Sequence, residues 1–199
     1  MYSSKPSVVY GFHGMDKAAA MSILNYQDNF RHSNNIYDWL GDGVYFWENN
    51  HERAKQYALE DMKRPKTKIK EPFVLGAVIE LSNCLDLLDQ KHIDFVKFAH
   101  SEMVKSLDTN NKPIPINSGF GTVDFDFKRR ELDCAVIRHA HAIALKEGLK
   151  FDSVRAAFME GNAIYSGAKF FDKNHIQLSI LNPDCIKGIF LPRQPTCLL

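Results

Sequence analysis

The pattern of apolar positions predicts strands toward both ends of the chain and helices between them. Continuous or alternating apolar runs are typical of strands, whereas apolar residues three and four apart are typical of helices. Strands are predicted at residues 8–14, 44–48, 73–81, 154–159, 163–165, 176–181 and 186–191. Helices are predicted at residues 17–24, 49–62, 89–107 and 130–147. This arrangement favours an α+β fold, and a single domain spanning residues 1–199.

Several segments carry more specific signals. The long apolar run at 73–81 indicates a strand buried on both faces. Asp16 and Asp89 are suitable caps for the first and third helices, and Gly148 is a suitable stop for the fourth. The Asn- and Pro-rich segment 108–127 is long for a loop in a compact domain, which is typical of functional or mobile loops.

Residues 37–48 carry the most information. Gly41 and Gly43 bracket Asp42, and an aromatic strand containing Tyr45 follows. Glycines here allow positive φ or a close approach to a ligand, and the aromatics favour a slot for a flat ring. Neither of the common glycine-rich phosphate motifs is present. The same pattern is also typical of a buried strand that follows a glycine turn.

Composition changes this picture little. The 199 residues are 45% hydrophobic and 25% charged, as in an ordinary globular domain with a core. The net charge of +1 implies no overall attraction to nucleic acid or membrane. The basic segment 63–70 is interpreted as a solvated connector, with contact to an anionic partner as the alternative.

The four cysteines, Cys84, Cys134, Cys185 and Cys197, show no C-x-x-C spacing and are expected to be reduced thiols. Neither a signal peptide nor an apolar run of membrane-spanning length is visible, so we expect a cytoplasmic protein without membrane contact. Export by a route without a signal stays open. His139 and His141 are two residues apart on a predicted helix and do not face each other, so no metal site is expected.

Three segments together resemble the NAD-binding signature of the ADP-ribosyltransferase superfamily. They are His13-Gly14 at a strand end, residues 41–46 followed by a helix with Tyr57, and residues 177–183 near the C-terminus. The resemblance is to the branch of diphtheria toxin and the poly(ADP-ribose) polymerases, whose site residues are His, Tyr and Glu. It implies a split, mostly antiparallel β core with surrounding helices and a NAD cleft. Residues 82–150 show no match.

The resemblance assigns a role to each matching residue. His13 would bind the adenosine ribose, and the backbone of Gly14 would hold the nicotinamide amide. Tyr45 and Tyr57 would enclose the nicotinamide ring. Further contacts to NAD are expected from Gly43 and Arg53.

The chain departs from the family pattern at three positions. Gln177 occupies the position of the glutamate, Met15 replaces the Ser or Thr after His-Gly, and Tyr57 lies one residue further along. Glutamine can bind the ribose but carries no charge. Glu160, in a predicted turn, is the best substitute carboxylate; a solvated turn residue is the other interpretation. The candidate catalytic residues are therefore His13, Tyr45, Gln177 and Glu160.

The resemblance implies a mono-ADP-ribosyltransferase that moves ADP-ribose from NAD to a macromolecular acceptor, with NAD as co-substrate and no metal. Breaking the nicotinamide bond requires a fixed dinucleotide and stabilisation of a cationic ribose. One alternative is a module that binds NAD or ADP-ribose without transfer. Another is an RNA 2′-phosphotransferase of the same fold, for which His13, Arg53 and the connector 63–70 are the candidate basic groups. The sequence does not distinguish a protein acceptor from a nucleic acid; residues 108–127 are our predicted surface for selecting it.

Overall fold

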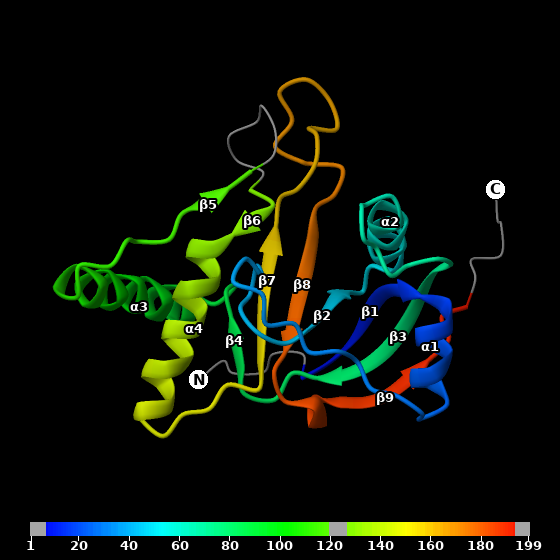
Figure 1. Cartoon of the computed structure of the whole chain (residues 1–199), viewed down its shortest axis with the longest axis horizontal. Helices are drawn as coiled ribbons and strands as arrows, with labels where there is room; N and C mark the ends of the chain where they lie inside the picture. Colours follow the sequence, from blue (N-terminus) through cyan, green and yellow to red (C-terminus); the bar gives the residue numbers. More distant parts are fainter. Residues whose placement is uncertain (1–6, 120–126, 194–199) are drawn as a thin grey trace.

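The computed structural model describes residues 7–119 and 127–193 (Figure 1). Its helices are α1 (Lys17–Leu24), α2 (His51–Met62), α3 (Gln90–Thr109) and α4 (Glu131–Lys146). The main sheet contains β1 (Val8–Asp16), β2 (Val44–Glu48), β3 (Pro72–Glu80), β4 (Cys84–Asp86), β7 (Ser153–Phe158), β8 (His175–Ile180) and β9 (Ile186–Phe190). A small second sheet pairs β5 (Asn117–Ser118) with β6 (Arg129–Arg130).

The seven strands of the main sheet lie in the order β4-β7-β8-β2-β1-β3-β9. Every neighbouring pair is antiparallel except β4 and β7, which are parallel. Strands from the two ends of the chain therefore meet in the middle, where β8 pairs with β2. This mixed architecture is compatible with the predicted α+β class.

The sheet is weakly joined at its centre. β1 pairs with β3 along its whole length, but with β2 at two positions, Gly11↔Glu48 and Phe12↔Trp47. Beyond Phe12 the two strands separate. This separation divides the sheet into a half built on β1, β3 and β9 and a half built on β2, β8, β7 and β4.

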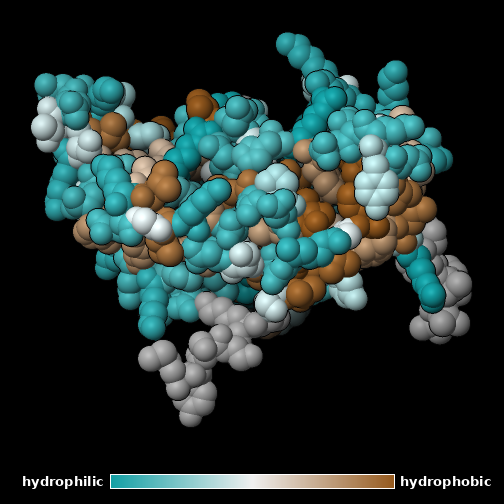
Figure 2. Space-filling model, turned by 90° about the horizontal axis from the view of Figure 1, so that it is seen from below, coloured by the Kyte–Doolittle hydropathy of each residue, from teal (hydrophilic) through white to brown (hydrophobic). Residues whose placement is uncertain are grey.

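The helices are distributed over both halves. In Figure 1, α1 and α2 lie beside β1 and β3, whereas α3 and α4 lie at the other end, beside β4 and β7. Figure 2 shows hydrophobic residues gathered on the lower face, toward the end that holds α1 and β9. One core cluster lies in the centre of the sheet around Phe46, Ile79 and Leu178, and a second lies between the sheet and α4 around Leu85, Ile137 and Val154.

Two predicted helix starts are confirmed and one is shifted. The side chains of Asp16 and Asp89 accept hydrogen bonds from the backbone N–H groups of Ala18 and Lys91. The helix predicted from residue 49 begins at His51, because Asn50 is the cap and its Oδ1 accepts from the N–H of Arg53 at 2.9 Å. Asn49 instead takes a left-handed conformation, with φ of 50°, and ends the strand.

The strand predicted at residues 163–165 was wrong. The structure has a single isolated bridge there, Ala163↔Phe171, and Ile164 and Tyr165 are exposed. The segment has a short apolar triplet but lies in the β7–β8 connection, where no neighbouring strand among the described residues extends the single bridge. The structure also adds β4, β5 and β6, which are too short to give a periodic signal.

The expected long loop is only partly a loop. α3 continues to Thr109, and β5 pairs with β6, so residues 117–118 are held near the start of α4. Residues 120–126 of the predicted segment 108–127 lie outside the described residues. Gly148 follows α4 with φ of 76°, as predicted for a helix stop. Cys134 and Cys185 are free thiols, and Cys197 lies outside the described residues.

Candidate active site

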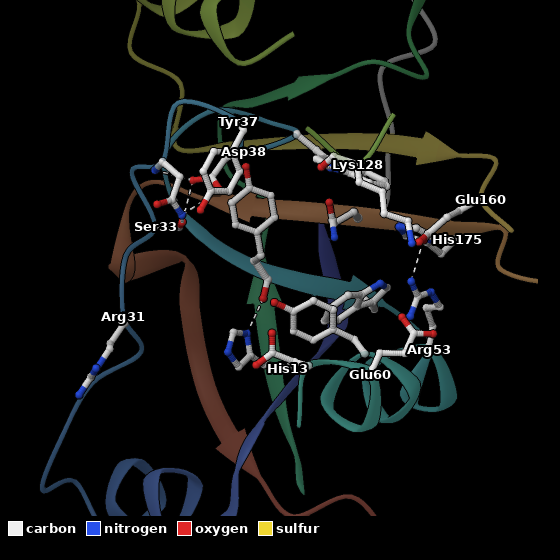
Figure 3. Close-up of a pocket in the computed structure, with 18 of the residues that line it drawn as sticks. His13, Arg31, Ser33, Tyr37, Asp38, Arg53, Glu60, Lys128, Glu160 and His175 are labelled. Carbon is white, nitrogen blue, oxygen red and sulfur yellow. Dashed lines mark hydrogen bonds and ion pairs between the residues drawn. The ribbon is translucent and has the colours of Figure 1, made fainter. Parts of the chain in front are cut away.

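A cavity of about 440 Å³ lies where β1 and β2 separate (Figure 3). Its walls come from β1, the segment before β2, β2 itself, α2, the β7–β8 connection and β8. It brings together all of the predicted site residues except Gly14, namely His13, Gly43, Tyr45, Arg53, Tyr57, Glu160 and Gln177. The three segments that resemble a NAD-binding signature thus converge on one cavity, although more than a hundred residues separate the last from the other two.

His13 occupies the gap between the two strands. Its Nδ1 lies 2.6 Å from the carbonyl oxygen of Tyr45, and its ring meets Phe30 and Phe46 edge to face. Because a carbonyl can only accept, Nδ1 carries the proton, which leaves Nε2 of the neutral ring as an acceptor. Burial lowers the pKa of His13 and outweighs the opposing effect of this hydrogen bond. A neutral imidazole therefore faces the cavity at pH 7.

Gly14 does not line the cavity with a side chain, but its backbone lies at the gap. A Cβ atom there would come 2.1 Å from the carbonyl oxygen of Ala54, so only glycine lets α2 pass this close to β1. The β1–β2 register would place Gly14 opposite Tyr45 if the pairing continued past Phe12. The carbonyl of Tyr10 accepts a hydrogen bond from the N–H of Asn49, so the backbone groups of Tyr10 point toward β2. Every second residue of a strand directs its backbone groups to the same side, so the backbone groups of Gly14, four residues later, also point toward β2. The predicted backbone role of Gly14 is thus compatible with its position.

Three aromatic side chains form one wall. Tyr45 and Trp47 project from β2, and Tyr57 projects from α2, with its ring centroid 4.9 Å from that of Trp47. The Tyr45 hydroxyl donates to the carbonyl of Gly41 at 2.5 Å and accepts from the N–H of Leu40 at 2.9 Å. Burial raises the pKa of both tyrosines, so both phenols are neutral. This wall suits a flat, cationic ring.

The glycine turn that precedes β2 fixes the position of Tyr45. Gly41 and Gly43 have φ of 73° and 143°, as expected for positions that favour glycine. Gly43 exchanges two backbone hydrogen bonds with Ser33, and Asp42 between the glycines forms an ion pair with Arg138 of α4. The turn is therefore held by the segment around Ser33 and by α4.

A polar cluster occupies the other end of the cavity. Arg53 Nη2 and Glu160 Oε2 form an ion pair at 2.7 Å, with both side chains almost fully buried. His175 Nδ1 lies 3.8 Å from the same carboxylate oxygen, and Gln177 lies two residues further along β8. Figure 3 shows Glu160, His175 and Arg53 side by side, away from His13. Glu160 is thus a buried member of the site and not a solvated turn residue.

Several buried polar atoms of residues that line the cavity have no partner among the described residues. A buried polar atom without a hydrogen bond is costly, so such atoms indicate where a ligand or ordered water binds. They are Trp47 Nε1, Arg53 Nε and Nη1, His175 Nε2 and Gln177 Oε1. Each belongs to a residue that lines the cavity. The walls of the cavity therefore contain both buried donors and buried acceptors.

Sequence reasoning missed Trp47 and His175 as site residues. Both could have been found by the two-residue period of a strand, because Trp47 follows Tyr45 and His175 precedes Gln177 by two positions. It also missed Tyr37 and Trp39, which line the cavity and hold Arg129 and Arg130 by cation–π contacts of 4.7 and 4.1 Å. No local pattern signals that contact, since about 90 residues separate the partners.

Buried histidines make folding stability depend on pH. Burial lowers the pKa of His13, His141 and His175 below 6.5, so the unfolded chain binds protons more tightly. Their contribution to stability is complete above pH 6.5 and is lost as the pH falls through their folded-state pKa values. We expect the free energy of unfolding to decrease below pH 6.5, with a slope of at most about 1.4 kcal/mol per pH unit for each histidine. Urea denaturation at pH 7.5, 6.5 and 5.5 measures this slope.

The control for this prediction is His141→Asn, which removes one of the three groups and should reduce the slope. A free energy of unfolding that is constant or increases between pH 6.5 and 5.5 would contradict the burial of these rings as neutral groups.

Comparisons with models of protein families, with curated proteins and with solved structures found no match to this chain. Over residues 7–119 and 127–193, no three His, Cys, Asp or Glu side chains come together as metal ligands. The same residues include no helix long and apolar enough to cross a membrane. What the cavity binds is therefore inferred from its own residues.

Proposed function

We propose that this protein is a mono-ADP-ribosyltransferase, a glycosyltransferase that moves ADP-ribose from NAD to a macromolecular acceptor and releases nicotinamide. The observation that carries the proposal is the convergence of His13, Tyr45, Tyr57 and Gln177 on one cavity. Distant residues chosen by a sequence signature have no reason to share a cavity unless the signature describes a site. The divided sheet, with its cavity at the division, also supports an ADP-ribosyltransferase-like fold.

In this proposal, the aromatic wall holds the nicotinamide end of NAD. Tyr45 and Tyr57 pack against the pyridinium, whose positive charge favours aromatic faces. The backbone of Gly14 binds the carboxamide, and Nε2 of neutral His13 accepts a hydrogen bond from the adenosine ribose. Holding both ends fixes the nicotinamide ribose between the aromatic wall and the polar cluster.

The polar cluster supplies the charge for bond breaking. As nicotinamide leaves, positive charge develops on the ribose carbon, and a nearby carboxylate stabilises it. Gln177 lies on the strand position of the family glutamate and binds a ribose hydroxyl through its free Oε1. Glu160 contributes the negative charge, and Arg53 orients its carboxylate at 2.7 Å. In this proposal, Glu160 in the β7–β8 connection supplies the carboxylate that Gln177 lacks.

The direct test is incubation with NAD labelled in its adenylate part, in the presence of a cell lysate, followed by measurement of free nicotinamide and of labelled macromolecules. We expect both to appear. If labelled NAD binds but neither product forms, the protein is the alternative binding module, which the uncharged Gln177 favours. The phosphotransferase alternative has less support, because Glu160 neutralises Arg53, one of the basic groups it would need.

Replacing Tyr57 by alanine should weaken NAD binding about 2–30-fold, because aromatic contacts to a cation contribute about 0.5–2 kcal/mol. Tyr57→Phe keeps the ring and should bind NAD as the native protein does. Calorimetric titration with NAD compares the two variants. Equal affinities of Tyr57→Ala and Tyr57→Phe would contradict a nicotinamide ring at this wall.

A further inference from the structure

His175 stands out among the buried side chains of the cavity. It is the first residue of β8 and lies on the same face of the strand as Gln177. Its ring is stacked on Trp39, with centroids 6.3 Å apart and planes at 29°, and packs against Phe158 at 5.6 Å. These contacts fix the ring beside the carboxylate of Glu160.

The hydrogen bonding of His175 defines which nitrogen is basic. Nδ1 lies 2.8 Å from the carbonyl oxygen of Lys173, which can only accept, so Nδ1 carries the proton. The lone pair of Nε2 has no partner among the described residues. The imidazole is therefore oriented by one nitrogen and has an unused acceptor at the other, as general bases are.

The surroundings keep this ring neutral. Burial is the largest effect on the pKa of His175 and lowers it; Arg53 and Arg130 act in the same direction. Glu160 and the hydrogen bond to Lys173 act in the opposite direction and are outweighed. The other candidate bases that line the cavity are already engaged or distant. Glu160 is paired with Arg53, Glu60 with Lys173 and Asp61 with Arg64, and Asp38 accepts a hydrogen bond from Ser33. His13 lies at the far end of the cavity.

We propose that His175 is the catalytic base that removes the proton from the acceptor during ADP-ribose transfer. This inference rests on the proposed function. The bond between the ribose carbon and nicotinamide breaks, and its electron pair leaves with nicotinamide. A lone pair of the acceptor oxygen or nitrogen forms the new bond to that carbon, and the acceptor proton moves to Nε2 and then to solvent.

The base also restricts the acceptor class. A carboxylate is already deprotonated at pH 7 and needs no base. A hydroxyl or N–H nucleophile must lose a proton, so a dedicated base indicates an acceptor of that kind. The product should therefore be an O- or N-glycoside and not an ester.

The experiment compares His175→Asn with His141→Asn. Asparagine reproduces the Nδ1 donor to Lys173 but has no basic nitrogen at the Nε2 position. His141 is a matched control, because it is also buried with an unpartnered Nε2 but does not line the cavity. Affinity for NAD, nicotinamide release, transfer to lysate acceptors and the pH profile of transfer are measured for each protein.

In the native protein and His141→Asn, transfer should rise with pH below 6.5 and then level off. His175→Asn should bind NAD within about twofold of the native affinity, but transfer ADP-ribose about a hundredfold more slowly and without that rise. The native product should not show the rapid cleavage by neutral hydroxylamine that is typical of carboxylate esters. Transfer by His175→Asn within threefold of native, an unchanged pH profile, or a product cleaved by hydroxylamine as rapidly as an ester would overturn the proposal that His175 is the base. A native protein that releases no nicotinamide would overturn the proposed function itself.

Discussion

Replacing Glu160 with glutamine should slow nicotinamide release from NAD by about 10²–10³-fold while leaving NAD affinity nearly unchanged. The buried carboxylate faces the cavity, where it can stabilise the positive charge that develops on the ribose. Removing one preorganised electrostatic group from such a site typically costs this much in rate. Nicotinamide release at saturating NAD measures the effect.

This substitution also leaves Arg53 as a buried charge without its counter-ion, which should lower the free energy of unfolding by about 3 kcal/mol. The control is the double variant Arg53→Met with Glu160→Gln. Removing both charges of a buried pair is close to neutral for stability, so this variant should regain most of the lost stability. It should stay inactive. Recovery of activity in the double variant would show that Glu160 serves only to hold Arg53.

Replacing Gly43 with alanine should lower the free energy of unfolding by about 3–5 kcal/mol and weaken NAD binding. A Cβ at this position would lie 2.1 Å from Ser179 Oγ and 2.9 Å from the carbonyl oxygen of Ile180, and φ is 143°. Relief requires the turn to move away from β8, and Tyr45 moves with it because its hydroxyl is bonded to the Gly41 carbonyl. Steric overlap with backbone and positive φ both contribute to the cost.

Gly148→Ala is a control for a positive φ without steric overlap. Gly148 also has a positive φ, 76°, but a Cβ there would meet no atom within 4 Å. We expect a loss of about 1–2 kcal/mol for this variant, from backbone conformation alone. Urea denaturation of both variants gives the comparison. If Gly43→Ala costs no more than Gly148→Ala, the close packing of the turn against β8 is not as described.

Local patterns predicted most of the elements that enclose the cavity. The strands around Phe12, Tyr45, Ile79 and Leu178 were predicted because long apolar runs leave few alternatives. The capping aspartates Asp16 and Asp89 marked two helix starts correctly. Short elements such as β4 were missed because their existence depends on tertiary pairing, here with β7, and not on local sequence.

The family signature predicted more of the candidate site than the periodicity and charge of the sequence did. His13 and Gln177 were proposed from their resemblance to a family signature, and the structure places both at one cavity. Glu160 was proposed as a substitute acid, but its partner Arg53 lies 107 residues away, so its burial was beyond sequence reasoning. The strand period could have placed His175 beside Gln177, but not its tautomer, which the carbonyl of Lys173 in the preceding turn fixes.

The most direct measurement of the central claim is a crystal structure of the protein with a NAD analogue that cannot be hydrolysed. We predict a pyridinium ring in contact with Tyr45 and Tyr57, His13 at the adenosine ribose, and Glu160 and Gln177 on the side of the nicotinamide ribose. An analogue bound outside the cavity, or bound with its adenine against this aromatic wall, would contradict the account.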